Sequence, residues 1–238
     1  MVHGLEGHWE IWCSLRRGCF EQFNLFSLDL PWSGEDGYEW CHTRPAEEWL
    51  HLTLELLPRA PALLVAHSYG VNVLLEYFQR SSIPGLEALV LMSTFYRPDF
   101  SVDDWTLFER SLAGFRAIFA EGISQRRGKA LEPALLSSMV EKVLDHVGPL
   151  GFMECFSRYV RTPSLDLGRI GVPVLVLAGE SDPGATREGN AALAAALPAA
   201  RLALFPHCGH FCMLEHPDLV ERTVREFLVT MSQPVLRD

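Results

Sequence analysis

The 238-residue sequence has no apolar run as long as a membrane-spanning helix requires, which is about 20 residues. It also lacks the N-terminal pattern of a secretory signal, in which an apolar segment follows a basic one. These two absences argue against a membrane span and predict a cytoplasmic protein.

Basic residues are scarce, and lysine is nearly absent. The 20 Lys and Arg residues are outnumbered by 30 Asp and Glu residues, which gives a formal net charge of −10, and the only lysines are Lys129 and Lys142. Because binding to phosphate groups needs a basic surface, this composition argues against nucleic acids and anionic membrane surfaces as partners. It says little about the charge of a small substrate.

The six cysteines follow no framework spacing, so we expect free thiols in a reducing compartment. Histidines and cysteines do crowd together near the C-terminus, at His207, Cys208, His210, Cys212 and His216. A closed zinc site of the usual kind would need a second cluster, such as a Cys-x-x-Cys pair, and the sequence contains none. We therefore expect no metal and no cofactor.

The hydrophobic content of 48% is enough for one domain with a sizeable core. Short apolar runs are separated by segments with helical spacing, and they occur at 62–66, 88–92, 173–178 and 201–206. Such runs are typical of strands buried on both faces of a parallel sheet. The alternation predicts an α/β fold in which helices flank a mostly parallel sheet.

The first of these strands leads directly into a serine. After the run that ends at Ala66, the hydrophobic spacing changes from that of a strand to that of a helix at Ser68. A serine on such a tight turn has a strained backbone, so the residues two positions away must be small, as Ala66 and Gly70 are. This turn would lift the hydroxyl out of the sheet.

An acid and a histidine follow two later strands. The strand expected at 173–178 is followed by Asp182, and the strand expected at 201–206 is followed by His210 in a glycine-containing loop. Both side chains therefore fall where strands give way to loops, which is where ligands bind in open α/β sheets.

Together these features resemble the α/β-hydrolase family, whose nucleophile turn is usually written G-x-S-x-G. Ala66 replaces the first glycine and keeps a small side chain at the crowded position. The chain order of Ser68, Asp182 and His210 is the order of nucleophile, acid and histidine in that family. The resemblance implies that His210 activates Ser68 and that Asp182 orients His210.

The resemblance also implies an oxyanion hole. In the family, a His-Gly dipeptide opens a loop whose backbone N–H acts together with the N–H of the residue after the nucleophile. Because this sequence has the dipeptide His3-Gly4, the resemblance assigns this role to the backbone N–H groups of Leu5 and Tyr69. Glu6 is unexpected there, because a carboxylate beside the site would oppose the developing negative charge unless it points away or is protonated.

The N-terminal edge of the sheet departs from the family pattern. Members usually place further strands ahead of the His-Gly dipeptide, whereas this sequence begins two residues before it. We expect that the N-terminal strands are shortened, that the start of the sequence is trimmed or misassigned, or that a partner covers this edge. A truncated edge exposes unpaired backbone groups, so homodimer formation stays open. Residues 24–30 resemble a further strand of the family. This strand would end in a turn that Asp29 holds.

Residues 95–171 interrupt the alternation of strands and helices. Their apolar spacing predicts helices at about 102–119, 134–147 and 151–160. The resemblance implies that this insertion forms a helical cap over an α/β-hydrolase core made of residues 1–94 and 172–238. Substrate would then bind between the cap and Ser68, and the many aromatic side chains suggest a bulky apolar acyl group, although each could instead belong to the core of the cap.

These features predict a serine hydrolase that cleaves an ester or thioester of a hydrophobic small molecule or of a carrier-bound acyl group. The same three residues could also hydrolyse a carbon–carbon bond or transfer an acyl group to an internal hydroxyl or amine, giving a cyclic product. A ligand-binding protein without catalysis is a further alternative. Epoxide and haloalkane hydrolysis are disfavoured, because those relatives need an aspartate where this chain has Ser68.

Overall fold

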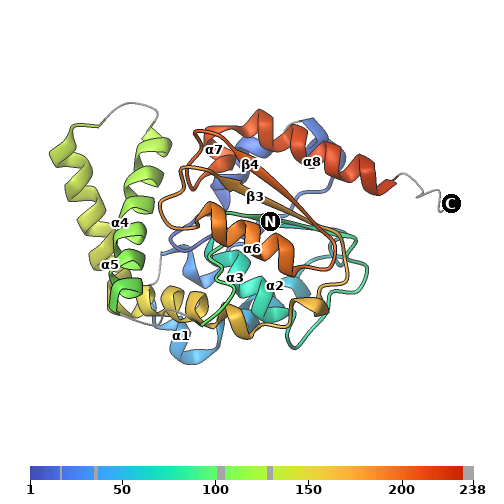
Figure 1. Cartoon of the computed structure of the whole chain (residues 1–238), viewed down its shortest axis with the longest axis horizontal. Coiled ribbons are helices and arrows are strands. Elements are labelled where there is room, and N and C mark those ends of the chain that lie inside the picture. Colours follow the sequence, from blue (N-terminus) through green and yellow to red (C-terminus); the bar gives the residue numbers. More distant parts are fainter. Residues whose placement is uncertain (17, 35–36, 101–104, 128–130, 233–238) are drawn as a thin grey trace.

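Four short strands form a parallel sheet at the centre of the molecule (Figure 1). In sheet order they are β1 (Leu63–His67), β2 (Ala88–Met92), β3 (Val174–Gly179) and β4 (Ala200–Phe205). β2 and β3 are buried along their whole length, as expected for a parallel sheet covered on both faces. The computed structural model describes residues 1–16, 18–34, 37–100, 105–127 and 131–232.

Helices cover both faces of this sheet. They are α2 (Ala46–Glu55), α3 (Tyr69–Tyr77), α6 (Arg187–Ala196), α7 (Cys212–Glu215) and α8 (Pro217–Ser232). Because side chains alternate along a strand, Leu89 and Val90 of β2 lie in different apolar cores. The core of Leu89 includes side chains of α2, α3 and α6, and the core of Val90 includes side chains of α7 and α8. Figure 1 shows α8 on one side of the sheet and α2 and α3 on the other.

Several short helical turns complete the part of the chain that packs on the sheet. They are η1 (Trp9–Leu15), η2 (Gly18–Gln22), η3 (Pro31–Ser33), α1 (Trp40–Thr43), η4 (Thr162–Ser164) and η5 (Leu167–Arg169). Among the residues that the structure describes, no helix is both long enough and apolar enough to cross a membrane.

Between β2 and β3 the chain leaves the sheet and forms two long helices, α4 (Trp105–Arg127) and α5 (Pro133–Arg161), which extend to one side in Figure 1. α5 bends at Gly148, which has φ 58° and ψ −174° and precedes Pro149. The helices expected at 134–147 and 151–160 are therefore the two halves of α5. The helix expected from residue 102 continues to Arg127, and its first residues, 102–104, lie outside the described residues.

Within the described part of the chain, the sheet continues beyond β1 only as a single parallel bridge between Val2 and Ala66. The Val2 N–H donates to the Val65 carbonyl at 2.8 Å, and the Leu28 N–H donates to the Met1 carbonyl at 3.0 Å. The prediction of a strand at residues 24–30 is wrong, because this segment forms no strand and meets the N-terminus through few backbone hydrogen bonds.

A buried arginine ties α5 to the helices under the sheet. Arg158 donates to Glu154 within α5 at 2.8 Å, to Glu47 of α2 at 3.2 Å, and to Glu76 of α3. Its side chain is only 3% exposed. Glu154 also accepts a hydrogen bond from the Tyr69 hydroxyl at 2.9 Å, so this ion-pair network reaches the residue after Ser68.

Candidate active site

Ser68 lies on the sharp turn that joins β1 to α3. Its backbone has φ 55° and ψ −127°, a conformation that costs free energy for a residue with a side chain. The turn is crowded, since a Cβ atom on Gly70 would lie 2.4 Å from the His3 carbonyl oxygen. Ala66 is fully buried. The requirement for a small residue at position 70 therefore has a direct steric cause.

The structure brings Ser68, Asp182 and His210 together. The Nε2 atom of His210 lies 2.8 Å from the Ser68 Oγ atom, and its Nδ1 atom lies 2.8 Å from Asp182 Oδ2. The Oδ1 atom of Asp182 accepts the N–H groups of Gly184 and Ala185, each at 2.9 Å. All three side chains are buried. They follow three different strands, β1, β3 and β4, as expected from the sequence.

The backbone of His210 is held from the side of the sheet by two residues that the sequence analysis missed. Its carbonyl oxygen is 2.9 Å from His67 Nε2 and accepts the Ser93 hydroxyl at 2.9 Å. Burial, followed by the neighbouring His210, lowers the pKa of His67 well below its usual range, so its ring is neutral. Both residues stand at strand ends, at the last position of β1 and directly after β2, which is the signal that could have identified them.

A carboxylate from α4 holds the same loop from the other side. Glu121 accepts the backbone N–H of His210 at 2.6 Å and that of Phe211 at 3.3 Å. The preceding N–H, of Gly209, donates to both carboxylate oxygens of Glu215 at 3.1 and 3.0 Å. Burial and the nearby Glu215 raise the pKa of Glu121 to about 7. No sequence signal links Glu121 to a loop that lies 89 residues away.

The loop expected to form the oxyanion hole is fixed by His3. Its Nδ1 atom is 2.8 Å from the Gly4 carbonyl oxygen, and its Nε2 atom accepts the Leu30 N–H at 3.2 Å. Burial lowers the pKa of His3 to about 4, so the ring is neutral at pH 7 and carries its proton on Nδ1. A Trp32 N–H donates to the His3 carbonyl at 3.1 Å. The dipeptide His3-Gly4 is therefore a rigid corner of the fold.

This corner lies against the serine. A Cβ atom on Gly4 would be 3.0 Å from the Ser68 Cβ atom, which places the following residue, Leu5, beside the site. Tyr69 is the first residue of α3, so its backbone N–H has no acceptor within the helix. The arrangement is compatible with the predicted pair of N–H donors from Leu5 and Tyr69.

Glu6 is engaged with its own neighbours. Its carboxylate accepts the Tyr38 hydroxyl at 2.6 Å and lies 3.9 Å from His146 of α5. Burial raises the pKa of Glu6, while the hydrogen bond from Tyr38 and the nearby His146 act in the opposite direction. Its backbone has φ 52°, which is uncommon for a residue other than glycine. Glu6 lines a cavity together with Ser68, and its raised pKa favours the neutral form of the carboxyl there.

A model of the alpha/beta hydrolase family matches residues 1–223. The chain belongs to this family. A relative of known activity is the pimeloyl-[acyl-carrier protein] methyl ester esterase of Nitrosomonas europaea, which is 22% identical over 233 residues, 92% of this chain and 90% of that protein.

Solved structures agree with this hydrolase in fold. The monoacylglycerol lipase of Paleococcus ferrophilus has a TM-score of 0.61 and 22% identity, over 97% of this chain and 93% of that one. A thermophilic esterase from Thermogutta terrifontis has a TM-score of 0.56 and 20% identity, over 98% and 89% of the two chains. The prediction of an α/β-hydrolase fold is therefore confirmed.

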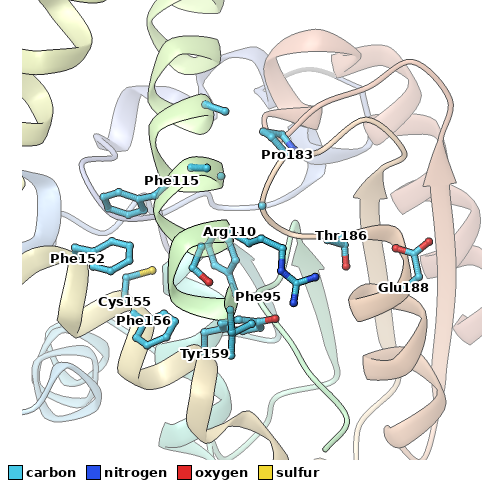
Figure 2. A pocket seen from close by; sticks show the side chains of 16 residues that line it. Phe95, Arg110, Phe115, Phe152, Cys155, Phe156, Tyr159, Pro183, Thr186 and Glu188 are labelled. Carbon is cyan, nitrogen blue, oxygen red and sulfur yellow. The ribbon is translucent and has the colours of Figure 1, made fainter. Parts of the chain in front are cut away.

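Two cavities adjoin the candidate site of this hydrolase. A cavity of about 260 Å³ reaches Ser68 and His210, and its walls include Leu5, Phe119 and Phe211. A larger cavity of about 660 Å³ lies between α4, α5, the loop at residues 183–186 and the first turn of α6 (Figure 2). Figure 2 shows Phe152 and Phe156 on one side of it and Thr186 and Glu188 on the other. α4 and α5 thus line both spaces.

One cluster has donor atoms of the kind that bind metals. Single donor atoms of Cys208, Glu215 and His216 lie within 4.8 Å of one another. However, both oxygens of Glu215 already accept the Gly209 N–H. A hydrogen bond with Cys212, followed by burial, raises the pKa of the Cys208 thiol, which keeps it protonated. We interpret this cluster as support for the loop that carries His210.

Proposed function

We propose that this hydrolase cleaves esters or thioesters of hydrophobic acyl groups, with Ser68 as nucleophile. The observation that supports this most strongly is the continuous contact from Asp182 through His210 to Ser68, with both distances at 2.8 Å. It occurs in a buried site next to a cavity that is lined mostly by apolar residues. An imidazole hydrogen bonded in this way can remove the hydroxyl proton as the oxygen attacks a carbonyl carbon.

In the proposed mechanism, His210 Nε2 takes the proton from Ser68 Oγ and then gives it to the leaving alcohol or thiol. Asp182 keeps the ring oriented and stabilises its positive charge. The backbone N–H groups of Leu5 and Tyr69 would bind the oxyanion, and a donor of this kind is typically worth about 3–4 kcal/mol of barrier. Water activated by His210 then releases the acyl group from Ser68.

The insertion at residues 95–171 is proposed to act as a cap over this site. Phe119 of α4 and Cys155 of α5 line the cavity that contains Ser68, which supports a substrate site between these helices and the sheet. The Nitrosomonas europaea relative is named as an esterase for a methyl ester on an acyl-carrier protein. Carrier-bound acyl groups therefore belong among the candidate substrates.

Hydrolysis of p-nitrophenyl esters with acyl chains of increasing length tests the proposed function. We expect release of p-nitrophenol together with the free acid, identified by mass spectrometry. With a p-nitrophenyl ester of an ω-hydroxy acid, which carries an internal hydroxyl, release of a lactone in place of the free hydroxy acid would instead favour acyl transfer within the substrate. Binding of the esters without any turnover would contradict the proposal and favour a ligand-binding protein.

A further inference from the structure

Among the described residues, three side chains lie between the two cavities. Phe95, Phe115 and Cys155 line both the cavity that contains Ser68 and the larger cavity of Figure 2. They come from three separate elements, namely the loop after β2, α4 and α5. Phe115 and Cys155 are buried, and Phe95 is partly buried. We call these three side chains the partition.

Ring contacts on both sides of the partition support this placement. The Phe95 ring lies 5.6 Å from the His210 ring and 6.3 Å from the Tyr159 ring, measured between centroids. His210 borders the cavity with Ser68, whereas Tyr159 borders the larger one. Phe115 repeats this pattern, with Phe119 at 4.7 Å on the Ser68 side and Phe152 at 5.3 Å on the other.

We propose that the partition sets the length of the straight acyl chain that can react at Ser68. This inference rests on the proposed ester hydrolysis. An acyl group bound at Ser68 can fill the space of about 260 Å³ but meets Phe95 and Phe115 before it reaches the space of about 660 Å³. Beyond the partition, the aromatic side chains Phe152 and Phe156 would accept an alkyl chain, and Arg110 lies at the same cavity (Figure 2).

The test compares kcat/KM for p-nitrophenyl decanoate with kcat/KM for p-nitrophenyl butyrate. In the unmodified enzyme the decanoate should be the poorer substrate. Phe95→Ala and Phe115→Ala join the cavities, and each methylene newly buried contributes about 0.8 kcal/mol. The decanoate-to-butyrate ratio should therefore rise by roughly 10- to 100-fold in each variant. Because a ratio is measured, a loss of the Phe95 contact with His210 does not obscure the result.

Phe108→Ala is the matched control. Phe108 lies on α4 and packs on Phe152 and Phe156, yet it is not among the described residues that line either cavity. Its truncation should leave the ratio unchanged. An unchanged ratio in both partition variants, or an equal change in Phe108→Ala, would overturn the inference. Phe95→Leu and Phe115→Leu replace the alanine variants if those do not fold. Failure of the unmodified enzyme to hydrolyse either ester would instead count against the proposed function.

A second inference comes from the carboxylate that α4 places against the loop of His210. Glu121 accepts the N–H groups of His210 and Phe211, and a Cβ atom on Gly209 would lie 2.4 Å from its carboxylate oxygens. We infer that Glu121 is a positioning residue, which holds the backbone of His210 from α4 while His67 and Ser93 hold it from the sheet. This inference also rests on the proposed function.

The charge of Glu121 should affect this hold. Burial is the largest influence on the pKa of Glu121 and raises it. Glu215 of α7 and Asp182, after β3, also raise this pKa, while His210 lowers it, and the result is a pKa of about 7. Cys208 lies in the same loop but is kept as a neutral thiol. Below pH 7 Glu121 is mostly protonated. Above pH 7 its negative charge strengthens the two hydrogen bonds and favours the imidazolium that forms on His210 during turnover.

Glu121→Gln and Glu121→Ala separate positioning from packing. The amide oxygen of Gln can accept the same N–H groups without titrating, so Glu121→Gln should match the unmodified kcat at pH 6 and fall about 3- to 10-fold below it at pH 8.5. Glu121→Ala should lower kcat by roughly 10- to 100-fold at both pH values with little change in KM. A kcat ratio between the unmodified enzyme and Glu121→Gln that stays constant with pH would overturn the inference, as would a fully active Glu121→Ala.

Discussion

Ser68→Ala should lower kcat/KM for p-nitrophenyl butyrate by about three to six orders of magnitude while the fold persists. The hydroxyl of Ser68 lies 2.8 Å from His210 Nε2, and the substitution removes the oxygen atom that is proposed to attack the carbonyl carbon. The remaining rate would come from water and the oxyanion donors. The strained turn does not depend on the hydroxyl, so thermal unfolding should change little.

Ser157→Ala provides the control for this experiment. Its hydroxyl donates to the Glu154 carbonyl within α5, away from the proposed chemistry. This variant should keep full activity. If Ser68→Ala retained more than a few per cent of the activity, the nucleophile would be another group and the proposed mechanism would be wrong.

Arg158→Ala should lower the free energy of unfolding by about 3–5 kcal/mol, the usual cost of removing one partner of a buried ion pair. Its loss leaves the carboxylates of Glu47, Glu76 and Glu154 without the guanidinium that joins them. For a chain of this size the expected fall in Tm is roughly 6–20 °C. The loss of stability should be smaller at pH 5. Burial already raises the pKa of Glu76, and removal of Arg158 would raise it further, so more of this carboxyl is neutral at pH 5 and its burial without a cation costs less.

Arg161→Ala is the natural comparison for this stability measurement. Arg161 also pairs with Glu76, at 3.3 Å, but its side chain is 56% exposed. Exposed pairs typically contribute about 0–1 kcal/mol. Equal stability losses for the two variants at pH 8 would contradict the view that the buried arginine ties α5 to α2 and α3.

The sequence predicted those parts of the site that depend on local patterns. Ser68 could be placed on its turn because the period of the hydrophobic residues changes there and because Ala66 and Gly70 are small. Asp182 and His210 each follow an apolar run, and the carboxyl ends of parallel strands share one edge of the sheet. That shared edge, rather than their spacing in the chain, accounts for the 2.8 Å contacts.

Features that depend on contacts between distant segments could not be predicted. Glu121 is an ordinary helical glutamate until α4 packs against the loop of His210, and Arg158 has a defined role only where three helices meet. The partition has the same origin, since Phe95 and Phe115 face two cavities that exist only in the folded chain. The prediction of a strand at residues 24–30 failed because the resemblance does not say how many backbone hydrogen-bond partners that segment finds in the folded chain.

Labelling with a fluorophosphonate, followed by mass spectrometry of the peptides, tests most directly whether His210 makes Ser68 reactive. At pH 8 the folded, unmodified enzyme should carry one phosphonyl group on Ser68, and His210→Ala should react at least about 1000-fold more slowly. A label on another residue, no label on the folded enzyme, or an unchanged rate in His210→Ala would contradict the proposed nucleophile.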